Sequence, residues 1–165
     1  ADIELLASNP EKVEELRNNG VKTFVKSIIE NVALNVAQNS NREADLSIDI
    51  SDAIVKLSSA KLSKIVEEII DNAFKFSEPN TPVKIIGSSY NNTFRLFIID
   101  HGRGMTEEQI NNVGAYIQFE RKMYEQQGSG LGLLIAKTLV ELHGGEFLIE
   151  SIYEKQTIIR IVLPR

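Results

Sequence analysis

Three polar residues in one predicted helix have the chemistry needed to hold a metal-bound polyphosphate. Glu68, Asn72 and Lys75 stand at positions i, i+4 and i+7, so on an α-helix they share one side, beside the apolar stripe. An amide oxygen can coordinate Mg²⁺, a lysine can neutralise phosphate, and a carboxylate can accept a proton. The alternative is a solvated helix edge with a glutamate–lysine pair, and this pattern alone does not decide between the two.

A second candidate group lies where an apolar strand ends in a glycine-rich turn. Asp100 follows the apolar residues 96–99, so we expect its carboxylate near the interior, where an ionised group needs hydrogen-bond donors. The amino group of an adenine is one such donor. Gly102 and Gly104 leave room beyond the carboxylate for a close backbone approach or a positive φ. An ordinary Asp-Gly turn is the alternative.

Three further glycines stand at the start of a helix predicted over residues 131–142. They are Gly128, Gly130 and Gly132. Backbone amides at a helix start can hold phosphates, helped by the helix dipole. The spacing is neither that of a Walker loop, which needs Gly-Lys-Ser/Thr, nor that of the dinucleotide motif GxGxxG, because Leu133 replaces the last glycine. By itself this segment is weak evidence for a nucleotide site.

The helices that must position these groups are predicted from apolar periodicity. One is expected over residues 21–36, with a core-facing stripe of Phe24, Ile28, Val32 and Val36. Another begins after a cap at Ser58 or Ser59 and carries the polar residues described first. Its expected core-facing residues are Leu62, Ile65, Val66, Ile69, Ile70 and Ala73. A shorter helix is predicted over residues 9–18.

Strands are predicted over residues 46–50, 83–89, 93–99, 146–153 and 157–163. Asn91-Asn92 indicates a hairpin between two of them. Residues 105–127 form a long polar segment with a short helical piece near residues 106–112, which is typical of a functional or mobile loop. This order predicts a two-layer α/β sandwich, with about three helices on one face of a mixed, mostly antiparallel sheet.

Composition restricts the class of protein. The chain has 165 residues, of which 42% are hydrophobic, and this fits one domain with a sizeable core. The net charge of −5 argues against a general nucleic-acid surface, and the absence of cysteine excludes disulfides and thiolate metal sites. The longest apolar runs have the length of strands, and no signal peptide is visible. We therefore expect a cytoplasmic domain without direct membrane contact.

Taken in order, these segments resemble the catalytic, ATP-binding domain of sensor histidine kinases, in the GHKL ATPase superfamily. Residues 68–77 resemble its asparagine box, residues 100–105 and 128–133 its two glycine boxes, and residues 119–121 its phenylalanine box. The likeness covers residues 21–165. It implies the histidine-kinase-like ATPase fold with a lid at about residues 105–127. Residues 1–20 are then an N-terminal helical segment, the possible tail of a dimerisation helix.

The resemblance also implies a role for each site residue. Asn72 would coordinate Mg²⁺, Glu68 would act as general base or activate the acceptor, and Lys75 would contact phosphate. Phe76 would lie against the adenine, and Asp100 would bond its amino group. The other nucleotide-binding positions implied are Gly102, Gly104, Phe119, Arg121, Gly128, Gly130, Leu131, Gly132 and Thr157. Gln156 replaces the glycine that often precedes this threonine in the family.

The acceptor of the phosphoryl group is expected to lie elsewhere. Histidine kinases phosphorylate a histidine on a separate dimerisation helix, and neither His101 nor His143 stands in that context. The resemblance therefore implies ATP and Mg²⁺ as ligands, and two-component signal transduction as the setting. The implied partners are a dimerisation domain and a downstream response regulator, with the isolated domain a monomer.

Two other functions share the fold. One is a nucleotide-dependent protein-binding regulatory module, or a serine kinase of the anti-sigma-factor type. The other is an ATPase clamp of the gyrase or Hsp90 type, which needs transducer domains that this chain lacks. The acid lability of a phosphorylated product would separate a histidine acceptor from a serine acceptor.

Overall fold

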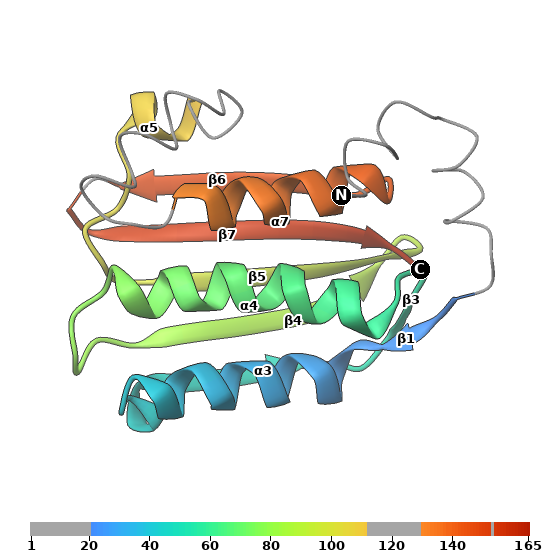
Figure 1. Cartoon of the computed structure of the whole chain (residues 1–165), viewed down its shortest axis with the longest axis horizontal. Helices are drawn as coiled ribbons and strands as arrows, with labels where there is room; N and C mark the ends of the chain where they lie inside the picture. The colour runs from blue at the N-terminus through green and yellow to red at the C-terminus, as the bar shows by residue number, and fades with distance from the viewer. Residues whose placement is uncertain (1–20, 112–129, 153) are drawn as a thin grey trace.

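The computed structural model describes residues 21–111, 130–152 and 154–165. Three helices, α3 (Val25–Asn39), α4 (Ser59–Lys75) and α7 (Gly130–Leu142), lie side by side on one face of a five-stranded sheet (Figure 1). The sheet order is β2 (Leu46–Ile50), β4 (Val83–Tyr90), β5 (Thr93–Asp100), β7 (Gln156–Pro164) and β6 (Glu146–Ile152). Only the β2–β4 pair is parallel among these neighbours. The predicted sandwich with a mostly antiparallel sheet is confirmed.

Several short elements complete the described part of the chain. β1 (Thr23–Phe24) and β3 (Ile54–Val55) pair antiparallel as a separate small sheet. The 3₁₀ helix η1 (Glu43–Asp45) precedes β2, and α5 (Glu107–Asn111) follows β5, where a short helical piece was predicted. The helix predicted over residues 9–18 and most of the predicted lid lie outside the described residues. In the described part, no helix is both long and apolar enough to cross a membrane.

The core lies between the helices and the sheet. All six predicted core-facing residues of α4 are buried, because their spacing of three and four keeps them on one side of a helix. Alternate residues of β5, Phe94, Leu96 and Ile98, face the helices and are buried as well. These contacts hold the ends of α4 and β5 in place. Asn72 and Asp100 lie at those ends.

The first helix turns a slightly different side to the core than predicted: Val36 is buried and Ile28 and Val32 are half-buried against the core, but Phe24 lies outside the helix. The buried residues of α3 are Val25, Ile29, Ala33, Val36 and Ala37. Phe24 belongs to β1, opposite Ile54, and is 61% exposed. Apolar residues at 24 and 25, 28 and 29, and 32 and 33 form two overlapping stripes, so periodicity alone could not choose between them. The buried side includes two alanines, and α3 packs against α4.

The hairpin between β4 and β5 forms at the predicted place. Tyr90 pairs with Thr93, which leaves a two-residue loop. Its residues Asn91 and Asn92 have φ of 48° and 62°. Tight hairpin loops of this kind need two left-handed residues, and asparagine tolerates that conformation well. The turn sets the register of β5 and therefore the position of its last residue, Asp100.

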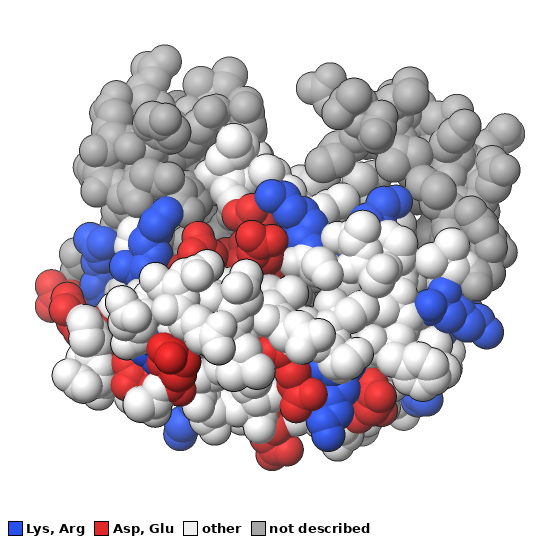
Figure 2. All heavy atoms as spheres, turned by 60° about the horizontal axis from the view of Figure 1, so that its bottom comes forward, with Lys and Arg blue, Asp and Glu red and all other residues white. Residues whose placement is uncertain are grey.

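Charged side chains of both signs are interspersed over the face drawn in Figure 2. This mixture matches a chain with 23 acidic and 18 basic residues. A mixed surface exerts no strong bulk attraction on a charged partner.

Candidate functional site

A small cavity lies at one end of the sandwich, where α4 and β5 end and α7 begins (Figure 1). Its volume is about 20 Å³. The cavity is lined by Asn72, Phe76, Asp100, Arg103, Gly104, Met105, Leu133 and Thr157. Five of these residues are predicted site residues, and they come from three separate parts of the sequence. The fold therefore brings together groups that the sequence analysis connected only by resemblance.

Asn72 presents an unsatisfied oxygen in this cavity. The residue is 7% exposed, and among the described residues no hydrogen-bond donor reaches its Oδ1. Leaving a buried polar atom unpaired costs about 1–3 kcal/mol, so such an atom is a candidate contact for a ligand. An amide oxygen is a ligand that Mg²⁺ accepts. The orphaned oxygen therefore fits the metal-binding role predicted for Asn72.

The remaining ligands of such an ion have no ready-made cluster of side chains in the described part of the chain. The described residues contain no group of three or more His, Cys, Asp or Glu able to hold a metal ion. Mg²⁺ typically keeps several waters and takes the rest of its ligands from one or two protein groups and from substrate phosphates. The site therefore fits a metal that arrives with a phosphate ligand.

Asp100 is a buried carboxylate at the other wall of the cavity. It is 6% exposed, and the backbone N–H of Gly102 donates to its Oδ1 at 2.8 Å. Burial raises the pKa of Asp100 to about 6, although the Gly102 hydrogen bond and the charge of Arg42 act in the opposite direction. An additional neutral donor, such as an adenine amino group, would stabilise the ionised form here.

The two glycines of the turn after β5 allow the close packing that forms the cavity. A Cβ atom at Gly102 would clash with the carbonyl oxygen of Phe76. Gly104 has a φ of 69°, and a Cβ atom there would clash with the carbonyl oxygen of Ile152. The turn therefore contacts both the end of α4 and the end of β6 through its backbone, and a larger residue at either position would separate these walls.

Thr157 lies beside Asp100 because the two residues are paired in the β5–β7 register. Its Oγ1 is 3.2 Å from Oγ of Ser151, which donates to the carbonyl of Gln156 at 2.9 Å. The same serine oxygen accepts a hydrogen bond from the backbone N–H of Met105 at 2.6 Å. This network joins β6 and β7 to the glycine turn. The replacement of glycine by Gln156 leaves Thr157 in the wall of the cavity.

The two predicted charged residues of α4 lie outside the small cavity. Glu68 forms an ion pair with Lys64 at 2.7 Å, and this hydrogen bond raises the pKa of Lys64. Lys75 is exposed and lines a wider depression of about 500 Å³ together with Phe76, Gly102 and others. That volume is in the range typical of small-molecule sites. The two hollows share Phe76 and Arg103, so they adjoin.

The predicted glycines of the second box are only partly described. Gly130, Leu131 and Gly132 form the first turn of α7, where backbone N–H groups have no acceptor within the helix. Leu133, in the same turn, lines the cavity. These amides can therefore donate hydrogen bonds to an anion near the site. Phe119, Arg121 and Gly128 lie outside the described residues.

Four residues of this region were not predicted as site residues. Arg103 lines both hollows, and its guanidinium lies 5.2 Å from the centroid of the Phe76 ring. Met105 and Leu133 line the cavity, and each directly follows a glycine of a predicted box, which was an available signal. Arg42 lies far back in the sequence within a polar stretch, and no local signal distinguishes it.

Comparison with known proteins gives the family. Residues 57–165, more than half of the chain, match the family model described as "Histidine kinase-, DNA gyrase B-, and HSP90-like ATPase". The chain is 33% identical over 110 residues to the sensor histidine kinase YvrG of Bacillus subtilis, covering 66% of this chain and 19% of the relative. It is 31% identical over 104 residues to the histidine protein kinase DivJ of Caulobacter vibrioides, covering 62% of this chain and 17% of the relative. The chain thus spans less than a fifth of either relative.

Solved structures of histidine kinases have the same fold as this chain. The mycobacterial sensor histidine kinase MprB superimposes with a TM-score of 0.72 at 27% identity, covering 87% of this chain and 95% of that one. The catalytic domain of histidine kinase ThkA gives a TM-score of 0.73 at 18% identity, covering 87% and 94%, and this second likeness concerns the fold alone. The chain therefore belongs to the histidine kinase-, DNA gyrase B- and HSP90-like ATPase family, as the type of ATP-binding domain found in sensor histidine kinases.

Proposed function

We propose that this domain binds Mg-ATP and transfers the γ-phosphoryl group to a histidine on a separate dimerisation domain of a two-component sensor kinase. The observation that carries the proposal is the cavity that two buried polar groups line. One is Oδ1 of Asn72, which has no donor among the described residues, and the other is the carboxylate of Asp100, whose pKa burial raises to about 6. A ligand with a metal at one end and an amino group at the other would satisfy both.

The adenine would occupy the Asp100 end. The carboxylate would accept a hydrogen bond from the adenine amino group, with the ring of Phe76 alongside and Thr157 next to Asp100 in the lining of the cavity. The cavity of about 20 Å³ is far smaller than a purine ring, so the side chains around it must move when the base enters. Arg103 and Met105 are suited to this movement because both are long and unbranched.

The phosphates would lie between the end of α4 and the start of α7. Lys75 supplies a positive charge at the end of α4, and the amides of the first turn of α7, which have no acceptor within the helix, supply hydrogen-bond donors. Asn72 would hold Mg²⁺, which when bound neutralises phosphate charge. Each group placed here would act by orienting the phosphates and by balancing charge, which is the main source of catalysis in phosphoryl transfer.

Glu68 is the proposed base. Its ion pair with Lys64 uses part of the carboxylate, and a carboxylate has about four acceptor positions, so capacity remains for a histidine N–H. In the transfer, the bond between the γ-phosphorus and the bridging oxygen breaks as a phosphorus–nitrogen bond forms. ADP leaves with the bridging oxygen, and the histidine proton passes to Glu68. A response regulator would then receive the phosphoryl group.

The test is phosphotransfer to a supplied acceptor. The chain is incubated with radiolabelled ATP, Mg²⁺ and the dimerisation domain of its own full-length protein, and the product is treated with acid and with base. We expect an acid-labile, base-stable phosphoprotein. An acid-stable product would favour the serine-kinase alternative, and ATP binding without any transfer would favour a regulatory binding module.

A further inference from the structure

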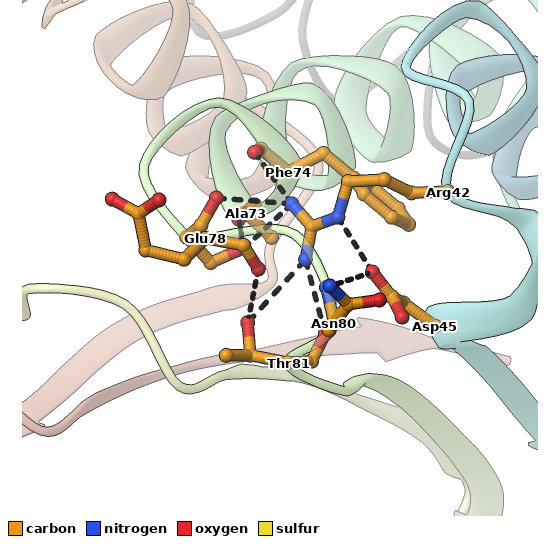
Figure 3. Close-up of polar contacts among 8 residues, drawn as sticks. Arg42, Asp45, Ala73, Phe74, Glu78, Asn80 and Thr81 are labelled. Atoms are coloured by element: carbon orange, nitrogen blue, oxygen red, sulfur yellow. Dashed lines mark hydrogen bonds and ion pairs between the residues drawn. The ribbon is translucent and has the colours of Figure 1, made fainter.

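One buried arginine links the end of α4 to the loop that follows it. Arg42 precedes η1 and is 6% exposed. Figure 3 shows its guanidinium reaching between Phe74, Thr81 and Asp45. Its Nη1 donates to the carbonyl of Phe74 at 2.9 Å and its Nη2 to the carbonyl of Thr81 at 3.0 Å, while Nε pairs with Asp45 at 2.8 Å. The guanidinium also lies 5.0 Å from the centroid of the Phe74 ring.

These contacts replace the usual end of a helix. The last carbonyls of a helix have no donor within it, and a glycine or asparagine just after the cap commonly allows the chain to satisfy them. Here the cap is Phe76 and the next residue is Ser77. Ser77 Oγ donates to the carbonyl of Ala73 at 2.7 Å and itself accepts from Arg42 at 3.0 Å. Arg42 thus acts as a long-range cap, and its positive charge suits the negative end of the helix dipole.

The loop between α4 and β4 is held by the same arginine. Arg42 donates to the carbonyl of Ser77 at 3.0 Å as well as to that of Thr81. Its partner Asp45 accepts the backbone N–H of Asn80 at 3.0 Å. The hydrogen bond from Arg42 lowers the pKa of Asp45, so the pair stays ionised at neutral pH. The loop is therefore fixed to η1 along its length.

The segment held in this way carries the walls of the candidate site. Asn72 lies in the last turn of α4, Phe76 caps the helix, and both residues line the cavity. The carbonyl of Phe76 accepts the backbone N–H of Arg103 at 3.4 Å and lies against Gly102 with no room for a side chain. A shift at the end of α4 would therefore move both the Asn72 wall and the turn that bonds Asp100.

We propose that Arg42 is a positioning residue of the nucleotide site. It holds the end of α4 and the following loop in the arrangement in which Asn72 and Phe76 receive the nucleotide. This inference rests on the proposed function, because it concerns the affinity of that same site. A purely structural role would instead change stability and leave the affinity of the folded protein unchanged.

The test compares variants at a temperature at which circular dichroism shows each of them folded. Arg42→Gln removes the positive charge and the planar guanidinium group. Arg42→Lys keeps the charge, but its single ammonium group cannot reach three carbonyls at once. Affinity for a non-hydrolysable ATP analogue with Mg²⁺ is measured by calorimetry. We expect Arg42→Gln to bind on the order of 10-fold more weakly or worse, because small displacements of positioning groups have effects of this size. Arg42→Lys should be intermediate.

Two controls separate positioning from stability. Arg95→Gln removes another arginine stacked on an aromatic ring, 4.3 Å from the Tyr90 centroid, at the hairpin end of the sheet. Val55→Ala removes volume from a fully buried position in β3 and lowers the melting temperature. Both should bind the analogue like wild type. In Arg42→Gln, but in neither control, the backbone amide NMR signals of Gly102 and Arg103 should shift.

The outcomes are distinct. Wild-type affinity in folded Arg42→Gln, or an equal loss in Val55→Ala, would overturn the positioning role. Absence of binding in the wild type would overturn the proposed function itself. If Arg42→Gln fails to fold, Ser77→Ala replaces it, because this change removes only the hydroxyl contacts at 2.7 and 3.0 Å. A few-fold loss of affinity in folded Ser77→Ala would support the proposal, and none would contradict it.

Discussion

The two ends of α4 are held by different kinds of contact. At the start, Ser58 caps the helix by accepting the backbone N–H of Lys61 at 3.2 Å, a contact three residues apart. At the end, Arg42 supplies the donor, across 32 residues of sequence. The first end is determined locally, and the second depends on the rest of the fold. Only the second end carries groups with the chemistry of a site.

The chemical groups differ in the same way. The first half of α4 buries apolar side chains such as Leu62, Ile65 and Val66. The last turn contains Asn72, whose Oδ1 has no donor among the described residues. The end of the helix packs on the turn after Asp100. Polar groups that are costly to bury persist where function needs them. Changes at the two ends should therefore separate stability from nucleotide binding.

The largest effect is expected at the site end, from Asp100→Asn. The amide would still accept the Gly102 N–H, but its own NH₂ group would face the adenine amino group, donor against donor. We expect nucleotide affinity to fall roughly 100-fold, the scale of a lost hydrogen bond to a charged group. Calorimetry with ATP and Mg²⁺ measures it. Asp49→Asn, at an exposed position of β2, is the matched control and should bind normally.

The same variant should be more stable than wild type without nucleotide. Burial raises the pKa of Asp100 from its ordinary 3.8 to about 6, so the folded state binds more protons than the unfolded state between these values. Wild-type stability from this group therefore falls as pH rises from about 4 to about 6 and then levels off. This pKa difference corresponds to about 3 kcal/mol of unfolding free energy.

Urea unfolding of both proteins across this pH range measures the difference. The Asp100→Asn advantage should be greatest above pH 6 and should close below pH 4. A difference that does not change with pH would show that Asp100 titrates alike in the folded and unfolded states.

Gly102→Ala should lower both stability and nucleotide affinity, the affinity by less than Asp100→Asn lowers it. The added methyl group forces the glycine turn away from Phe76. Overpacking of this kind typically costs roughly 2 kcal/mol. Because the turn also holds Asp100, we expect affinity to fall on the order of 10-fold. Gly87→Ala is the control, since its added methyl group would meet the Phe94 ring, away from the cavity. It should lower the melting temperature while keeping nucleotide affinity.

The smallest effect is expected at the other end of the helix. Ser58→Ala removes the local cap and should cost about 1 kcal/mol of unfolding free energy. Nucleotide affinity should not change, because this cap lies at the opposite end of α4 from the residues that line the cavity. Ser59→Ala, one residue on and exposed, should leave stability unchanged. A loss of affinity in Ser58→Ala would show that the two ends of α4 do not act independently.

The contrast also explains which features could be predicted from the sequence. The apolar stripe of α4, its serine cap and the Asn91-Asn92 hairpin are encoded within a few residues, so periodicity and turn chemistry identified them. The side of α3 that packs on α4 could not be chosen, because two apolar stripes overlap and the choice depends on the neighbouring helix.

The site was predictable to the extent that its motifs are local. Asn72 was singled out by its helical spacing with Glu68 and Lys75, and Asp100 by its position at the end of an apolar strand; the fold places Asn72 and Asp100 in one cavity. The ion pair of Glu68 with Lys64 follows the i, i+4 rule, while Lys75 lies about 10 Å farther along the helix. Arg42 could not be found, because most of its partners on α4 and the following loop are carbonyl oxygens, which every residue has, and they lie more than 30 residues away in the sequence.

The most direct test of the nucleotide site is a calorimetric titration of ATP into wild type and Asn72→Ala, each with and without Mg²⁺. If Asn72 Oδ1 is a metal ligand, Mg²⁺ should strengthen ATP binding in wild type and should have little effect in Asn72→Ala. Both proteins should unfold at similar temperatures, because the substitution removes an oxygen that has no donor among the described residues. Equal enhancement by Mg²⁺ in the two proteins would contradict the assignment.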